Sequence, residues 1–264
     1  MIERCEPTQS VPVRCIEVDS PSSLFLVTQA FIPTHNSHFA QQLWHQVARG
    51  HDIRTAIFSA ETPSKPYVRR YQRQFYAGKL ERDMDDEELV YADQWISDHF
   101  VFMQHPNARP TFSWLMDTIE AAAQRYGCRA AVVDPWNKLE ADYNPGKERE
   151  TQWIGNCLDD LLDAARALNM HIMIVAHPTK PDSERRRQPP DLYDISGSQH
   201  WNNRVDQGFT MHRPEIVGED GTRKTEATFY QRKARFEELG HPCKLQMDLN
   251  LHTGAYESID YRTW

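Results

Sequence analysis

The sequence predicts an α/β protein built on a mainly parallel sheet, with antiparallel strands toward its C-terminal end. From Ser37 onward, short apolar runs alternate with amphipathic stretches of ten or more residues, which is typical of strand–helix–strand units. Further along, after residue 206, apolar and polar residues alternate between turn residues, which indicates antiparallel hairpins. Residues 1–36 follow a third pattern, of short β-type runs without helical periodicity.

The predicted elements account for most of the chain after Ser37. Gly50 is expected to cap the first helix, and Gly127 to end the fourth. Helices are expected over 37–49, 67–76, 87–96, 114–127 and 153–168. Strands are expected over 55–60, 100–103, 130–134, 171–177, 208–213, 227–236 and 244–251. In the last strand, Leu245, Met247 and Leu249 alternate and are expected to form one buried face.

The composition is that of a globular protein without a membrane span. The 264 residues are 39% hydrophobic and 26% charged, and no apolar run approaches the roughly 20 residues that a bilayer requires. The N-terminus has no secretory-signal pattern and the five cysteines form no CxxC pair, so we expect a reducing cytoplasm. The net charge of −8 argues against a generic nucleic-acid coat but is compatible with a local basic groove.

Three predicted strands end in side chains that suit a phosphate-hydrolysing site. Glu61 follows FSA, Asp134 ends VVD and His177 ends IVAH. Because the carboxyl ends of parallel strands meet at one edge of the sheet, we expect these side chains to lie close together. A carboxylate at this edge can hold Mg²⁺ directly or through water. Each residue taken singly has a simpler structural explanation, and only their combination indicates hydrolysis.

The order of five motifs resembles a known family. AET, VVDP, VAHPTK, DISGSQHW and QRKARF follow one another as in the helicase domain of the DnaB/Twinkle family, most like the phage primase–helicases, over roughly residues 37–260. The resemblance implies a RecA-like core that uses ATP and Mg²⁺ and assembles into a homo-oligomeric ring such as a hexamer. It also implies that Glu61 orients the attacking water, Asp134 is the magnesium carboxylate and His177 senses the γ-phosphate.

The same resemblance assigns roles to basic residues near the C-terminus. Arg235 matches the arginine finger that is given to the neighbouring subunit's site, and Lys233 matches its companion cation. Such a finger contributes about 10³–10⁵ in rate and requires a ring or filament, since one subunit does not complete its own site. The alternative is a solvated run of charges on an edge strand, formed by Arg232, Lys233 and Arg235.

A proline-rich basic loop directly follows His177. Its cationic residues are Lys180, Arg185, Arg186 and Arg187. Basic loops that line a ring channel follow the phosphate backbone without reading bases. We therefore expect this loop to contact single-stranded DNA, and the alternative is a flexible charged surface loop.

The phosphate-binding loop that this family needs is interrupted before the first helix. The motif G-x-x-x-x-G-K-[ST] wraps the phosphates with backbone amides and reaches the β- and γ-oxygens with its lysine. Here the sequence reads QAFIPTHN and then Ser37, so only the hydroxyl that binds Mg²⁺ is in place. We expect the chain alone to bind ATP weakly and to lack hydrolysis.

Residues 1–36 resemble the C-terminal end of an intein inserted between the loop lysine and Ser37. Asn36 can cyclise and cut the Asn36–Ser37 bond, while His35 polarises the carbonyl. Ser37 is then the nucleophile that accepts the upstream protein. We expect two domains, an all-β intein segment at 1–36 and the helicase domain at 37–264.

Cys15 and Thr34 match inteins whose internal cysteine attacks the upstream bond, although Cys15 can equally be a packed core residue. The shortness of the segment predicts a split intein. Its N-terminal half and the phosphate-binding loop would then come from another, upstream polypeptide. Misplaced gene boundaries would produce the same sequence.

Two further functions are compatible with the sequence. One is a RecA/RadA-type recombinase-like ATPase, against which the DISGSQHW and RKARF motifs favour a helicase. The other is a non-catalytic remnant that binds DNA or helicase subunits, and the interrupted loop favours it. For the helicase, the expected location is the cytoplasm of a bacterial cell or of a phage-infected host.

Overall fold

The computed structural model describes residues 35–61, 67–105, 110–143, 146–179, 188–195, 198–213, 222 and 224–259. The chain divides into two compact units, Met1–Pro33 and Thr34–Trp264, and every described residue belongs to the second. The all-β segment expected at 1–36 therefore lies outside the described residues, except for its last two positions.

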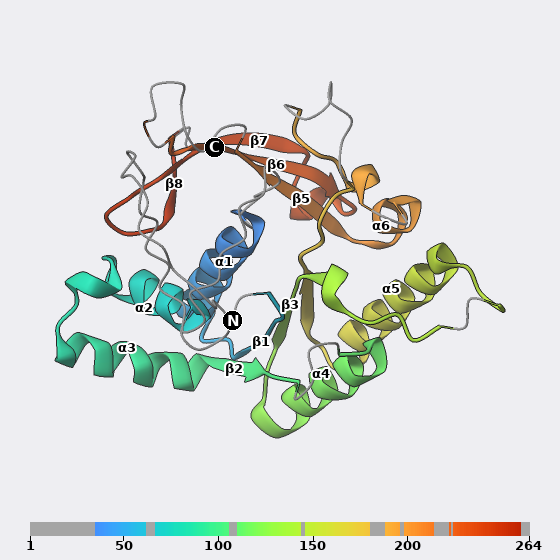
Figure 1. Cartoon of the computed structure of the whole chain (residues 1–264), viewed down its shortest axis with the longest axis horizontal. Coiled ribbons are helices and arrows are strands. Elements are labelled where there is room, and N and C mark those ends of the chain that lie inside the picture. Colours follow the sequence, from blue (N-terminus) through green and yellow to red (C-terminus); the bar gives the residue numbers. More distant parts are fainter. Residues whose placement is uncertain are drawn as a thin grey trace, which may run out of the picture. The chain divides into compact units, whose positions relative to one another are not determined.

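Two four-stranded sheets form the centre of the second unit (Figure 1). The first has the order β2-β1-β3-β4, and all its neighbouring strands are parallel. The register sets Ser59 beside Asp134 and Val133 beside Ile174. The predicted parallel sheet is confirmed. Its strands are β1 (Thr55–Ser59), β2 (Phe100–Met103), β3 (Ala130–Asp134) and β4 (His171–Ile174).

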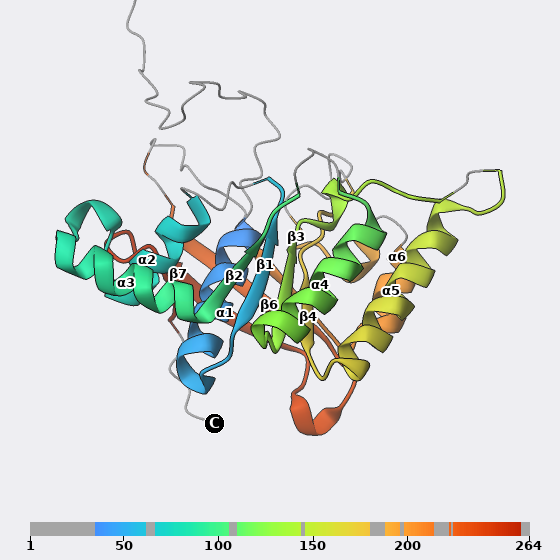
Figure 2. The same ribbon diagram turned by 90° about the horizontal axis from the view of Figure 1, so that it is seen from below.

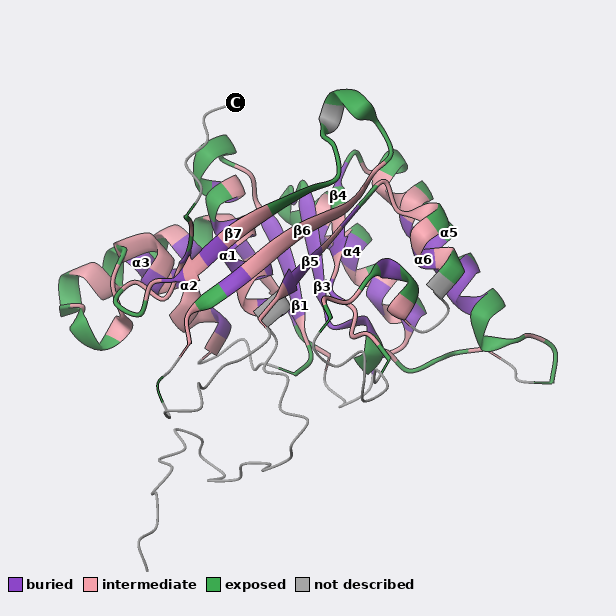
Figure 3. Ribbon diagram, turned by 90° about the horizontal axis from the view of Figure 1, so that it is seen from above, coloured by how far each residue is buried: buried purple, intermediate pink, exposed green. Residues whose placement is uncertain are grey.

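Helices cover both faces of the parallel sheet (Figure 2). The first face carries α1 (His35–His51) and α3 (Asp86–His99), which share a core with Ile57 and Val132, together with α2 (Arg69–Ala77), which packs against α1 and α3. The second face carries α4 (Phe112–Tyr126), α5 (Glu150–Ala167) and α6 (Ser198–Arg204), which share a core with Phe58 and Val133. Successive side chains of a strand point to opposite faces, so β3 is buried along its whole length and β1 at every position except Ser59, as Figure 3 shows for the two strands.

The second sheet is antiparallel, with the order β5-β6-β7-β8, which confirms the hairpins predicted near the C-terminus. Met247 and Leu249 are buried and Leu245 is partly buried, so the predicted alternating face is also confirmed. Phe39 of α1 packs against this sheet, with its ring 5.9 Å from that of Phe209. The strands are β5 (Gln207–His212), β6 (Glu226–Ala234), β7 (Cys243–Leu249) and β8 (Tyr256–Ser258).

Two helix ends differ from the prediction for α1. Gly50 is not a C-cap, because the helix continues to His51 and Asp52 takes the left-handed backbone position with φ of 52°. The N-terminal prediction is also wrong for two residues, since α1 begins at His35 rather than after residue 36. Gly127 does end α4 in the left-handed conformation, as expected, with φ of 66°.

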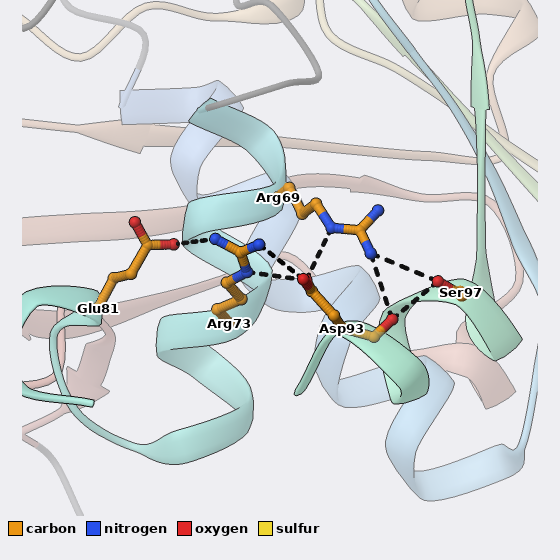
Figure 4. A network of polar contacts seen from close by, with 5 residues as sticks. All are labelled: Arg69, Arg73, Glu81, Asp93 and Ser97. Atoms are coloured by element: carbon orange, nitrogen blue, oxygen red, sulfur yellow. Dashed lines mark hydrogen bonds and ion pairs between the residues drawn. The ribbon is translucent and has the colours of Figure 1, made fainter. Parts of the chain in front are cut away.

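An ion-pair network joins α2 to α3 (Figure 4). Arg73 donates to both carboxylate oxygens of Asp93 and also to Glu81, and Arg69 donates to Asp93 from one turn earlier. α3 starts earlier than the sequence predicted because Asp85 and Glu88 form a reciprocal capping box. These ion pairs hold α2 against α3, while Val90 and Tyr91 of α3 remain exposed.

The strands of the parallel sheet are shorter than predicted at the edge where chemistry was expected. β1 ends at Ser59 and β4 at Ile174, so Glu61 and His177 lie two and three residues beyond their strands. Short 3₁₀ helices occupy Glu81–Asp83, Trp136–Lys138, Leu192–Asp194 and Glu237–Leu239. No helix in the described ranges is both long and apolar enough to cross a bilayer.

Candidate nucleotide-hydrolysis site

Ser37 and Asp134 meet at the carboxyl edge of the parallel sheet. The Ser37 hydroxyl donates a 2.7 Å hydrogen bond to Oδ1 of Asp134. Ser37 lies in the first turn of α1 and Asp134 is the last residue of β3, so the N-terminal end of this helix lies beside the C-terminal end of this strand. Their exposed fractions are 7% and 2%, which means that this pair is enclosed by protein.

The environment of Asp134 disfavours its charged form. Burial raises the pKa of its carboxyl to about 6, the nearby charge of Glu61 adds to this effect, and the Ser37 hydrogen bond opposes it. A cation at this point would relieve the burial of the charge. Hydroxyl and carboxylate oxygens are the ligands that Mg²⁺ prefers, and Mg²⁺ usually takes only one or two carboxylates beside phosphate and water. The donor set therefore fits Mg²⁺, and among the described residues no larger His, Cys, Asp or Glu cluster competes for a metal.

Glu61 lies next to this pair, as the sequence predicted. The backbone N–H of Ala60 donates to the Asp134 carbonyl at 2.9 Å, which holds the end of β1 beside the end of β3. The Glu61 carboxylate lies 3.2 Å from Nζ of Lys138 and 3.8 Å from Nε2 of His177. The three strand-end residues thus converge on one place.

Two residues of this edge were missed by sequence reasoning. Lys138 forms the ion pair with Glu61, and Asn137 accepts a 2.8 Å hydrogen bond from the backbone N–H of His177. Both belong to the 3₁₀ turn directly after Asp134–Pro135, so their proximity to a strand end was the available signal. Asn137 fixes the backbone of His177, and Lys138 places a cation beside Glu61.

Lys233 and Arg235 lie on and just after β6, where both bind the C-terminal end of α6. Arg235 donates to the carbonyls of Asn203 and Arg204 at 2.8 and 3.0 Å and forms a 2.7 Å ion pair with Asp206. Nζ of Lys233 donates to the carbonyl of Asn202. Cations at this position complement the negative end of the helix dipole.

The other predicted site residues are only partly visible. Lys180, Arg185, Arg186 and Arg187 lie outside the described residues, as do Cys15 and Thr34. Both ends of the basic loop are anchored: Thr179 donates to the Asp194 carbonyl, and Arg232 donates to the carbonyls of Pro189 and Pro190. The backbone of His35 and Asn36 is helical.

The sheet order, the two helix layers and the Ser37–Glu61–Asp134–His177 edge define a RecA-like α/β domain with a candidate ATPase site. In fold, the chain is similar to a protein solved as an ATPase domain, with a TM-score of 0.68, 17% identity and coverage of 85% of this chain and 80% of that one. It is also similar to a DnaB-like replicative helicase solved for its interactions with primase, with a TM-score of 0.66, 17% identity and coverage of 83% and 54%.

Sequence comparison points to the same group. The chain is 32% identical to the chloroplastic/mitochondrial Twinkle homologue of Arabidopsis thaliana over 137 residues, which are 52% of this chain and 19% of that protein. It is 25% identical to the replicative DNA helicase DnaB of Mycobacterium intracellulare over 236 residues, 87% of this chain and 40% of that one. The chain thus spans less than half the length of these relatives. No protein-family model matches it. Over the matched residues, the chain is therefore similar to replicative DNA helicases of the DnaB and Twinkle kind.

Proposed function

We propose that this chain is the C-terminal portion of a replicative, ATP-dependent DNA helicase that becomes active after protein splicing. The single observation that carries the ATPase part is the 2.7 Å contact between Ser37 and Asp134 with Glu61 and His177 beside it. These are the side chains needed to hold Mg²⁺, to orient a water and to respond to a γ-phosphate.

The proposed chemistry assigns one task to each group at the sheet edge. Ser37 and Asp134 hold Mg²⁺ on the phosphates of ATP, and Glu61 orients the attacking water. Lys138 pairs with the Glu61 carboxylate and fixes its position beside the other two strand ends. His177 starts the segment that leads into the basic loop, so it is suited to pass the state of the phosphate on to DNA.

The proposed assembly is a homo-oligomeric ring, such as a hexamer, in the cytoplasm of a bacterial cell or a phage-infected host. Single-stranded DNA would run through it along Lys180, Arg185, Arg186 and Arg187. Arg235 would act on the neighbouring subunit's site, with Lys233 beside it. Support for the ring comes from the relatives, which are replicative helicases.

The proposed maturation uses residues 1–36 as the C-terminal part of a split intein. Asn36 cyclises with help from His35, and Ser37 accepts the upstream polypeptide that carries the phosphate-binding loop. Cys15 and Thr34 serve the internal-cysteine route. Mixing this chain with an upstream half and weighing the products tests the scheme. Ligated helicase and a fragment ending at Asn36 are expected, and Asn36→Ala should block release of that fragment.

The ATPase part can be tested without splicing. In a fusion, termed the joined protein, the strand and G-x-x-x-x-G-K loop of the Mycobacterium intracellulare DnaB replace residues 1–36 and lead directly into Ser37. We expect the joined protein to hydrolyse ATP with Mg²⁺ and the intact chain to show no turnover. Glu61→Gln should slow the joined protein by about 10²–10⁴-fold, the usual contribution of a positioned base. Glu87→Gln, an exposed carboxylate on α3, is the matched control.

A non-catalytic remnant is the second candidate, and the interrupted phosphate-binding loop before Ser37 is the observation that favours it. It predicts a joined protein that folds and binds DNA or helicase subunits but has no Glu61-dependent turnover. That result would replace the helicase proposal.

A further inference from the structure

Both oxygens of the Glu61 carboxylate face basic groups. Oε1 lies 3.2 Å from Nζ of Lys138, and Oε2 lies 3.8 Å from Nε2 of His177. A carboxylate that orients an attacking water must direct one oxygen at that water, at about 2.6–3.2 Å. In this arrangement the directions of both oxygens are set by Lys138 and His177.

The ion pair between Glu61 and Lys138 is suited to being broken. The side chain of Lys138 is 50% exposed, and that of Glu61 is 28% exposed. Water screens an ion pair at such a position, and exposed pairs change an equilibrium by at most about fivefold. Lys138 can therefore hold the carboxylate and still release it after a small displacement.

Lys138 is the last residue of a short turn whose first residue is fixed. This turn is the 3₁₀ helix that runs from Trp136 to Lys138, just after β3. Trp136 is buried, and its N–H donates to the Val175 carbonyl at 2.8 Å. Its ring packs against that of Trp153, with the two centroids 5.8 Å apart. Movement of the turn is therefore confined to its far end, which carries Lys138.

The middle residue of this turn holds the segment that leads into the basic loop. Oδ1 of Asn137 accepts a 2.8 Å hydrogen bond from the backbone N–H of His177. Two residues further on, the N–H and the hydroxyl of Thr179 donate to the Asp194 carbonyl at 2.7 and 2.8 Å. His177 thus lies between the turn and the anchored start of the basic loop. A displacement of that start reaches Asn137 through one hydrogen bond, and Lys138 is the next residue along the chain.

We propose that Lys138 is a positioning residue that restrains the Glu61 carboxylate, and that Asn137 ties this restraint to the basic loop. When DNA displaces the start of the loop, His177 draws Asn137 with it and Lys138 withdraws from Glu61. The carboxylate then turns to the attacking water, so hydrolysis is fastest in a subunit that holds DNA. The inference rests on the proposed function for the roles of Glu61 and of the basic loop.

Steady-state ATP hydrolysis by the joined protein tests the restraint. Without DNA, Lys138→Met should raise kcat by about two- to fivefold, the effect of losing an exposed ion pair. KM for ATP should not change, because Glu61 acts on the water and not on the binding of ATP. Lys138→Arg keeps a cation beside Glu61 and should keep the lower kcat. Lys79→Met is the matched control, because it removes a 2.6 Å ion pair with Glu88 whose side chains are 37% and 36% exposed.

A double variant shows the order in which the two residues act. With single-stranded DNA present, Asn137→Ala should lower kcat by about two- to fivefold, because DNA no longer withdraws Lys138. The double variant Asn137→Ala, Lys138→Met should have the kcat of Lys138→Met alone, because no restraint is left for Asn137 to control. Two residues that only stabilise the sheet edge would not change kcat in opposite directions.

Hydrogen exchange in the intact chain tests the link without hydrolysis. The amide of Leu139 donates to the Trp136 carbonyl at 3.0 Å and closes the turn. Addition of oligo-dT should speed its exchange by at least about twofold in the wild type but not in Asn137→Ala. The amide of Met84, which closes another 3₁₀ turn on Glu81 at 3.1 Å, is the internal control and should not respond.

Three results would overturn the inference and keep the proposed function. In a joined protein with Glu61-dependent turnover, they are an unchanged kcat in Lys138→Met, a kcat that falls toward that of Glu61→Gln, and additive effects in the double variant. If the joined protein does not fold, exchange decides, and an oligo-dT response elsewhere without one at Leu139 rejects the inference alone. A folded joined protein without Glu61-dependent turnover, or an intact chain that does not respond to oligo-dT anywhere, rejects the proposed function and this inference with it.

Discussion

Ser37 and Asp134, 97 positions apart in the sequence, share a hydrogen bond that is enclosed by protein. Ser37→Ala should therefore destabilise the intact chain by about 1–3 kcal/mol, because it leaves a buried carboxyl without its donor. Ser59→Ala is the matched control. Its hydroxyl is buried at the same sheet edge and has no hydrogen-bond partner among the described residues, so its loss should be neutral or stabilising.

Urea unfolding of both variants measures the difference. Combining Ser37→Ala with Asp134→Asn in a double-mutant cycle isolates the pair. Equal stabilities of the two serine variants would mean that the contact contributes nothing.

His45 and Asp134 are expected to affect stability with opposite pH dependence. Burial lowers the pKa of His45 from 6.5 to about 4. As the pH falls from 6.5 to 4, the imidazole therefore binds a proton in the unfolded chain but stays neutral in the folded chain. Relative to His45→Gln, the wild type should lose about 1.4 kcal/mol per pH unit across that window. Burial raises the pKa of Asp134 from 3.8 to about 6, so relative to Asp134→Asn the wild type should lose stability as the pH rises through that range.

Unfolding curves at pH 4, 5, 6 and 7 would check both slopes, because these pH values span the pKa shifts of His45 and Asp134. A wild type that tracks His45→Gln at every pH would show that the imidazole is not held neutral in the folded state.

The sequence was informative about elements and less so about their ends. Periodicity located β1, β3 and α4 because buried strands and an amphipathic helix leave clear patterns. Gly50 was misjudged because a glycine near a helix end is a cap only when the chain turns there, and α1 continues past it to His51. The strand ends predicted the convergence of Glu61, Asp134 and His177. Lys138 and Asn137 could not be predicted, because their contacts depend on the conformation of the 3₁₀ helix Trp136–Lys138, and no sequence periodicity indicates that conformation.

The separation into two sheets was also beyond the sequence. Strand order depends on crossover direction and face, and these are visible only once the helices are assigned to their layers.

Asp93 is the centre of the α2–α3 network and should be sensitive to neutralisation. The guanidinium of Arg73, and then that of Arg69, holds the pKa of Asp93 below its usual value. Asp93→Asn should therefore cost about 1.5–3 kcal/mol, the range for charge-assisted hydrogen bonds, reduced by the partial exposure of these groups. Asp98→Asn, an exposed change on the same helix, should have little effect. Thermal unfolding measures the melting temperatures of both variants. Equal melting temperatures would mean that the ion-pair network contributes nothing to stability.

Arg235 can be tested for action on a neighbouring subunit by mixing variants of the joined protein. Arg235→Ala removes the finger and Glu61→Gln removes the base, so each pure protein should be inactive. In mixed rings some interfaces pair an intact Glu61 with an intact Arg235, and hydrolysis should return there. If mixing restores nothing while Arg235→Ala lowers stability, the residue serves to hold Asp206 and the end of α6.

The basic loop predicts a salt effect that does not depend on DNA sequence. Replacing Arg185, Arg186 and Arg187 with alanine in the joined protein should weaken binding of single-stranded DNA. The log–log salt slope should shrink by about 2, at about 0.7 per phosphate contact. Fluorescence anisotropy with two unrelated oligonucleotides over a salt series would measure it. An unchanged slope would indicate that the loop is a solvated surface segment that does not contact the DNA phosphates.

Gln42 of α1 binds the backbone of Tyr256 with both ends of its side-chain amide, each at 2.7 Å, much as a neighbouring strand would. His38, one turn earlier, reaches the Gly254 carbonyl at 2.5 Å. Both residues lie within two turns of Ser37, on a helix about 25 Å long. Because these side chains join α1 to the β7–β8 hairpin, we expect a tilt of α1 at its Ser37 end to be passed on to that hairpin. A spectroscopic label near Glu257 should then respond to a change that begins more than 200 residues upstream.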